Sequence, residues 1–189
     1  MGQLILILGG VRSGKSAYAQ ELAQHQEAHR VLFVATAEAG DAEMARRITA
    51  HRQSRPVTWR TLEAPREVAK AIEDSLGDAR VVLVDCLTLL VSNVILALGE
   101  APDPDQAERA VQAEVQALWQ TCQARPATFI VVSNEVGLGL VPDNPLGRLY
   151  RDLLGQANQT LAVHAQAVYW MIAGLAVELK AMQVRKTTD

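Results

Sequence analysis

Near the start of the chain, a short apolar run leads into the pattern G-x-x-x-x-G-K-S, the spacing of a phosphate-binding loop. Gly9, Gly10 and Gly14 permit backbone conformations that a Cβ would forbid, so the loop N–H groups are able to point at one anion. Lys15 adds a positive charge for the terminal phosphates of a nucleotide, and the Ser16 hydroxyl suits Mg²⁺. The alternative is a glycine-rich turn that binds nothing. The apolar run before the loop and the helix-forming sequence after it favour a nucleotide site.

A second apolar segment ends in Asp85, which is another candidate for this site. In proteins with a phosphate-binding loop, a carboxylate at this place reaches Mg²⁺ directly or through water, opposite the serine of the loop. The alternative is an acidic residue that only ends a strand. Spacing does not rank the other acidic candidates, which are Glu43, Glu63, Glu73 and Glu135.

One of the four histidines, His51, is the candidate nucleophile. If residues from 42 onward form a helix, Met44, Ile48 and His51 share one face of it. The positive charges of Arg47 and Arg55 would lower the pKa of the imidazole and keep a nitrogen free to attack near neutral pH. A partly buried histidine beside solvated arginines is the alternative. His25 and His29 are expected in solvent, and His164 is expected at the surface or capping a helix.

Strand-like and helix-like segments alternate along the chain, which is typical of a parallel sheet covered on both faces. Strands are expected at 4–8, 31–35, 81–85, 129–133 and 167–172. Helices are expected at 15–26, 42–52, 66–75, 88–98, 104–124 and 145–164. The sequence therefore predicts an α/β fold of the P-loop NTPase type, with a mostly parallel central sheet and helices on both faces. Residues 1–182 are expected to form one domain, followed by a polar tail at 183–189.

Composition excludes several classes of protein. The chain has 189 residues, is 49% hydrophobic and contains no apolar run near 18 residues, so no membrane span is expected. Its start lacks a basic region before the apolar run, which favours a cytoplasmic protein without a signal peptide. A net charge of −3 without a block of Lys and Arg gives no reason to expect a nucleic-acid partner. Cys86 and Cys122 lack the spacing of metal ligands and are expected as buried free thiols.

Five blocks of sequence together resemble one known family. The loop from Gly9 to Ser16 reads G-G-V-R-S-G-K-S, and A-T-A follows at 35–37. E-M-x-x-R-I-x-x-H-R-x-x-R-P spans 43–56, V-D-C-L-T spans 84–88 and S-N-E-V-G spans 133–137. These blocks resemble the bifunctional adenosylcobinamide kinase / adenosylcobinamide-phosphate guanylyltransferase family of cobalamin biosynthesis. The resemblance extends from residue 4 to about residue 180.

This resemblance implies two reactions and a set of site residues. The first reaction phosphorylates adenosylcobinamide with a nucleoside triphosphate, ATP or GTP, and the second adds GMP from GTP through a guanylated histidine. His51 matches that histidine, Lys15 is expected to stabilise the transferring phosphoryl group, and Mg²⁺ is expected at Ser16 and Asp85. An oligomer, a trimer of identical chains, is also implied. Nucleotide contacts fall on Gly9, Gly10, Val11, Arg12, Ser13, Gly14, Lys15, Ser16, Ala35, Thr36, Ala37, Arg52, Gln53, Ser54, Arg55, Glu63 and Asp85.

Two other functions remain compatible with the residues alone. One is a small-molecule kinase with a phosphate-binding loop and no covalent step, in which His51 is structural. The other is a nucleotide-dependent switch or partner-binding protein without corrinoid chemistry. The turn at 133–137 is interpreted as a loop that faces the corrinoid or the nucleotide, with a simple strand-to-helix connection as the alternative.

Overall fold

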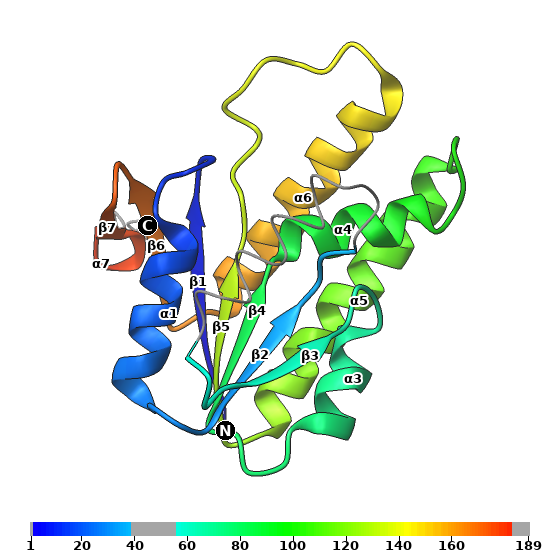
Figure 1. Ribbon diagram of the computed structural model, residues 1–189. Helices are drawn as coiled ribbons and strands as arrows, with labels where there is room; N and C mark the ends of the chain where they lie inside the picture. Colours follow the sequence, from blue (N-terminus) through cyan, green and yellow to red (C-terminus); the bar gives the residue numbers. More distant parts are fainter. Residues whose placement is uncertain (1, 39–55, 183–189) are drawn as a thin grey trace, which may run out of the picture.

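The computed structural model describes residues 2–38 and 56–182. Figure 1 shows a central twisted sheet with helices packed on its faces. The strands are β1 (Gln3–Gly9), β2 (Val31–Ala35), β3 (Arg60–Glu63), β4 (Val81–Asp85), β5 (Thr128–Val132), β6 (Ala167–Ile172) and β7 (Leu175–Glu178). The helices are α1 (Lys15–Gln26), α3 (Val68–Ser75), α4 (Leu87–Leu96), α5 (Pro104–Ala124), α6 (Pro145–His164) and α7 (Leu179–Met182).

The seven strands lie in the order β3-β2-β4-β5-β1-β6-β7. Each neighbouring pair is parallel except β6 and β7, which form an antiparallel hairpin. β5 therefore lies between β1, which leads into the phosphate-binding loop, and β4, which ends at Asp85. In open parallel sheets, ligands bind beyond the carboxyl ends of the strands. This topology places the ends of β1, β5, β4 and β2 along one edge.

Successive residues of the central strands enter two separate hydrophobic clusters, because strand side chains alternate between the faces of a sheet. In β1, Leu4, Leu6 and Leu8 pack into one cluster. Ile5 and Ile7 pack into the other. The first cluster lies under α3, α4, α5 and α6, and the second lies under α1 (Figure 1). Burial on both faces explains why these strands are nearly continuous apolar runs.

The two longest helices begin at side-chain caps followed by proline. Asp103 accepts a hydrogen bond from the N–H of Gln106 at 2.8 Å at the start of α5. Asn144 accepts one from the N–H of Gly147 at 2.6 Å at the start of α6. Proline suits the first helical position, since its missing N–H would have no partner there. The sequence therefore fixes where both helices begin.

The predicted P-loop α/β fold is confirmed, with a few corrections to its elements. The five expected strands are present within one residue at each end, but the edge strands β3 and β7 were not predicted. α3 begins two residues later than expected, and α4 is shifted by one to two residues. The helix expected at 42–52 lies outside the described residues. No helix among the described residues is long and apolar enough to cross a membrane.

Candidate functional site

The phosphate-binding loop joins β1 to α1 at the carboxyl edge of the sheet (Figure 1). α1 begins after Gly14, which has a φ of +97° and provides no side-chain cap. Helix N-termini leave backbone N–H groups without helical partners, and these attract anions. The Lys15 side chain folds back over the loop, where its Nζ donates to the carbonyl of Gly10 at 2.5 Å. The loop is therefore arranged around a place for a negatively charged group.

Lys15 is only 8% exposed, although it carries an ammonium group. Burial lowers the pKa of Lys15 and outweighs the opposing influence of Cys86 and Asp85. Desolvation always disfavours the charged form, and a bound anion reverses that penalty. A phosphate beside Lys15 would offset this cost, and Asp85 lies within electrostatic reach on the β4 side of the loop.

The three glycines of the loop have different roles. A Cβ on Gly9 would lie 2.5 Å from the carbonyl oxygen of Met171, and Gly14 has the positive φ that a side chain disfavours. Gly10 has neither restriction, since nothing lies within 4 Å of the position that its Cβ would take. The expectation that Gly10 needs a backbone conformation closed to other residues is therefore wrong. Its open surroundings form part of the space beside the loop.

We expect Gly14→Ala to lower the free energy of unfolding by about 1–2 kcal/mol, because alanine is strained at this φ. The added Cβ would also lie 3.2 Å from the Cα of Gly174. Gly10→Ala is the matched control and should change the free energy of unfolding by less than about 0.5 kcal/mol. Urea denaturation of both variants measures the difference, and equal stability of the two would contradict the assignment.

The turn between β6 and β7 supports the loop from its other side. The N–H of Gly174 donates to the carbonyl of Ser13 at 3.0 Å. Ala173 and Gly174 both have positive φ, as a two-residue hairpin turn requires. This support was not predicted, although a two-residue turn containing glycine between Ile172 and Leu175 is a recognisable hairpin signal.

Thr36 holds the ends of β2 and β4 together. Its side chain is fully buried. The hydroxyl donates to the carbonyl of Cys86 at 2.7 Å and accepts from the N–H of Cys86 at 2.8 Å. The amide of Asn93 then donates to the carbonyl of Thr36 at 2.8 Å and to that of Pro65 at 3.0 Å. Leaving such buried groups unpaired costs about 1–3 kcal/mol each, so these bonds hold Cys86 in place. Thr36 thereby fixes the position of Asp85, the residue before Cys86.

The end of β5 is tied to β1 and to two helices. The N–H of Ser133 donates to Ile7 at 2.9 Å, and the N–H of Glu135 donates to Gly9 at 3.1 Å. The N–H of Asn134 donates to the hydroxyl of Thr88 on α4 at 2.8 Å. The Asn158 side chain of α6 donates to the carbonyl of Asn134 at 3.1 Å. The turn at 133–137 therefore does more than connect a strand to a helix, because it borders the phosphate-binding loop.

The structure brings together part of the predicted site. The loop residues Gly9 to Ser16 lie along the same edge of the sheet as the segment from Ala35 to Ala37, Asp85 and Glu63. Glu63 lies on the edge strand β3, four strands away from β1 in the sheet order. The predicted residues His51, Arg52, Gln53, Ser54 and Arg55 lie outside the described residues.

The remaining histidines and cysteines lie away from this edge or have no role in it. His25 is exposed near the end of α1, and His164 ends α6, where its ring stacks on Trp119 with 4.4 Å between ring centroids. Trp119 is a core residue. Both cysteines are free, and Cys122 is buried, whereas Cys86 is only partly buried. Burial raises the pKa of Cys86 to about 11 and that of Cys122 to about 12.

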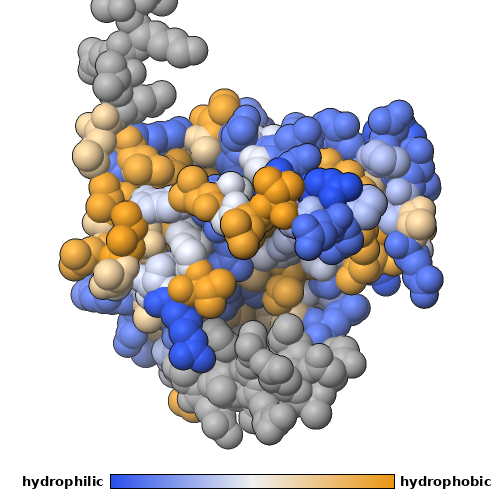
Figure 2. Space-filling model, turned by 90° about the horizontal axis from the view of Figure 1, so that it is seen from above, coloured by the Kyte–Doolittle hydropathy of each residue, from blue (hydrophilic) through white to orange (hydrophobic). Residues whose placement is uncertain are grey.

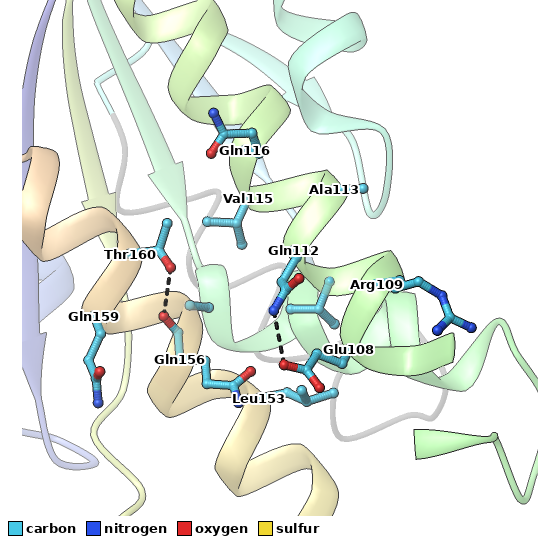
Figure 3. Close-up of a pocket in the computed structure, with 12 residues that line it drawn as sticks. Glu108, Arg109, Gln112, Ala113, Val115, Gln116, Leu153, Gln156, Gln159 and Thr160 are labelled. Atoms are coloured by element: carbon cyan, nitrogen blue, oxygen red, sulfur yellow. Dashed lines mark hydrogen bonds between the residues drawn. The ribbon is translucent and has the colours of Figure 1, made fainter. Parts of the chain in front are cut away.

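A groove of about 660 Å³ lies between α5 and α6, away from the phosphate-binding loop. Figure 3 shows amide side chains of both helices along it. Gln112 donates to Glu108 at 3.0 Å, and the Thr160 hydroxyl donates to the carbonyl of Gln156 at 3.0 Å. These contacts lie within single helices, and Glu108 and Arg109 are the charged residues that line the groove. The described residues of the predicted site lie at the carboxyl edge of the sheet instead.

The model of one protein family, described as cobinamide kinase / cobinamide phosphate guanyltransferase, matches residues 5–179. The chain belongs to this family. The match confirms the resemblance seen in the sequence. It also confirms the prediction made from it, a bifunctional kinase and guanylyltransferase of adenosylcobalamin biosynthesis.

Curated relatives agree with the family assignment. The chain is 42% identical to the bifunctional adenosylcobalamin biosynthesis protein CobU of Salmonella typhimurium, over 94% of this chain and 99% of that protein. It is 41% identical to CobU of Escherichia coli, with the same coverage. It is 43% identical to the protein CobP of Pseudomonas aeruginosa, over 93% of this chain and 96% of that one.

Two solved structures resemble the chain less closely. One is the RadB recombinase, for which the match covers 89% of this chain and 74% of that chain. The other is the flagellar accessory protein FlaH from Methanocaldococcus jannaschii, for which the match covers 93% of this chain and 75% of that chain. Their identities are 13% and 14%, and the TM-score is 0.49 in both cases. These likenesses are weak and carry no functional inference.

Proposed function

We propose that the chain first transfers the γ-phosphoryl group of a nucleoside triphosphate to the aminopropanol hydroxyl of adenosylcobinamide. It then joins the GMP part of GTP to the phosphate made in the first step, giving adenosyl-GDP-cobinamide. Membership of the family supports both reactions. The buried Lys15 at the uncapped start of α1 supports a triphosphate as the shared substrate, and this is the observation that carries the proposal.

His51 is the nucleophile of the second reaction in this proposal. An imidazole nitrogen attacks the α-phosphorus of GTP, and the bond to the bridging oxygen breaks so that pyrophosphate leaves. The phosphate of adenosylcobinamide phosphate then attacks the same phosphorus and releases the imidazole. A neutral imidazole is a suitable nucleophile at pH 7. The family resemblance of the segment around His51 supports this role.

The phosphate-binding loop holds the phosphates in both reactions. The loop N–H groups and Lys15 neutralise negative charge as it moves to the leaving group. Ser16 and Asp85 supply a hydroxyl and a carboxylate, the hard oxygen donors that Mg²⁺ prefers. When bound, Mg²⁺ would neutralise phosphate charge between these two residues. Thr36 acts by positioning Asp85, and Glu63 with the backbone of Ala35 and Ala37 would contact the nucleoside.

Two further features of the proposal come from the family resemblance. GTP is the guanylyl donor, and ATP or GTP serves the first reaction. The active molecule is a trimer of identical chains, with substrate sites near the contacts between subunits.

Incubation with GTP labelled at the α-phosphorus tests the covalent step. With Mg²⁺ present, we expect label on the protein that survives alkali and is lost in acid, because phosphoramidates have this stability. The γ-labelled nucleotide is the matched control and should leave no such label on the protein. Absence of stable α-label, in a preparation that still phosphorylates adenosylcobinamide, would leave a kinase without the covalent step.

A further inference from the structure

Glu135 has no role in the function proposed so far, although it borders the phosphate-binding loop. Its N–H donates to the carbonyl of Gly9, the first residue of the loop, at 3.1 Å. Two residues earlier, Ser133 is bonded to Ile7 in the same way. The backbone of Glu135 is therefore fixed to the end of β1, independently of the conformation of the remaining chain between β5 and α6.

The sheet order places Glu135 between the two known parts of the site. β5 lies between β1 and β4, so a residue just beyond β5 lies between the phosphate-binding loop and the end of β4 at Asp85. Asp85 is in electrostatic reach of Lys15 and is assigned to the metal. Glu63 lies four strands from β1. Glu135 is thus the carboxylate closest to β1 in the strand order of the described sheet.

The side chain of Glu135 is half-buried and held in one orientation. One carboxylate oxygen accepts a hydrogen bond from the N–H of Gly137 at 2.5 Å. Within the described residues, no ion pair involves Glu135. Arg148, on the first turns of α6, instead donates to the carbonyls of Pro142 and Asp143. A carboxylate that is fixed but not neutralised by a cation is suited to accept a proton.

The chain beyond Glu135 is exposed to solvent. Figure 1 shows this connection rising above the sheet before it enters α6. Leu138, Leu140 and Val141 are exposed on it, with 82%, 96% and 61% of their surface accessible. Viewed from above, hydrophobic side chains are interspersed with polar ones across this face (Figure 2). Exposed apolar side chains close to Glu135 in the chain suit a substrate larger than the nucleotide.

We propose that Glu135 is the general base of the phosphorylation step, an inference that rests on the proposed kinase function. The hydroxyl oxygen of adenosylcobinamide attacks the γ-phosphorus as its proton passes to the Glu135 carboxylate. The bond from that phosphorus to the β,γ-bridging oxygen breaks, and its electron pair leaves with the nucleoside diphosphate. The proton then passes from Glu135 to water.

The second reaction has no such need for a base. Its attacking group is a phosphate, whose second pKa of about 6 makes it an anion at pH 7. An alcohol keeps its proton at this pH and must lose it during attack. A general base at Glu135 therefore separates the two reactions, whereas a structural role in shaping the loop would affect both.

Glu135→Gln tests this assignment, because glutamine keeps the size and the acceptor for Gly137 but does not accept a proton. We expect kcat for phosphorylation of adenosylcobinamide to fall about 100-fold, with KM for the triphosphate within about threefold. Guanylyl transfer to adenosylcobinamide phosphate, supplied directly, should stay within about threefold. Glu135→Asp should be more active than Glu135→Gln. The matched control is Asp143→Asn in the same connection, which should leave both reactions unchanged.

Several results would overturn the assignment. One is phosphorylation by Glu135→Gln within about threefold of the unmodified protein. Another is an equal loss of both reactions, or a loss of triphosphate affinity measured by calorimetry, since either would make Glu135 a structural part of the loop. Failure of the kinase proposal itself would be distinct, because the unmodified protein would then not phosphorylate adenosylcobinamide at all.

Discussion

Replacing His51 by alanine is expected to abolish guanylation of the protein from GTP, by at least about a thousandfold, while phosphorylation of adenosylcobinamide stays within about threefold. Neither His25 nor His164 is placed to take over. His25 lies ten residues into α1, about 15 Å along the helix from Lys15. His164 ends α6 next to β6, at the opposite edge of the sheet, and its ring is stacked on Trp119.

The α-labelled nucleotide on a denaturing gel measures guanylation, and conversion of adenosylcobinamide to its phosphate measures the first reaction. His25→Ala is the matched control, since His25 is exposed and should leave both reactions as they are. Retention of acid-labile label by the His51 variant would place the nucleophile elsewhere. An equal loss of both reactions would contradict separate roles for the imidazole and the phosphate-binding loop.

Lys15→Met should reduce both reactions by about 100- to 1000-fold, because each depends on the same positive charge beside the phosphates. The substitution should not unfold the protein. Burial already lowers the pKa of Lys15, which means that the folded chain holds its charge at a cost. Removing the charge therefore leaves the melting temperature unchanged or raises it.

Steady-state rates of the two reactions and thermal unfolding measure these effects together. Lys70→Met on α3 is the matched control, because Lys70 is exposed and should leave the rates unchanged. A Lys15 variant that loses activity together with its folded structure would contradict the explanation. So would a variant that loses one reaction and keeps the other, because the loop is proposed to serve both.

The part of the site that could be predicted is the part encoded in consecutive residues. The phosphate-binding loop lies within the eight residues from Gly9 to Ser16, and Asp85 follows directly from a buried strand. The central strands were found because burial on both faces makes them continuous apolar runs. β3 and β7 were missed because they are short edge strands with much of their surface exposed.

Other contacts of the site form only when segments that are distant in the sequence come together in the fold. The sequence gives no sign that the Thr36 hydroxyl bonds to Cys86, 50 positions away. The contact of Gly174 with Ser13 and the position of Glu135 beside Gly9 likewise depend on strand order. Glu135 was one of four acidic candidates that spacing alone did not rank. Its distinction comes from β5 lying next to β1, which local patterns do not encode.

The support of the loop by the last hairpin has a consequence for synthesis on the ribosome. β1 and the loop emerge first, yet both strand neighbours of β1, and the turn at Gly174 that holds Ser13, are translated much later. Contacts between such remote segments form slowly and late. A nascent chain therefore carries an unfinished nucleotide site until residue 174 has been made. We therefore expect nucleotide binding to appear in one late step of synthesis, after β6 and its turn have been made.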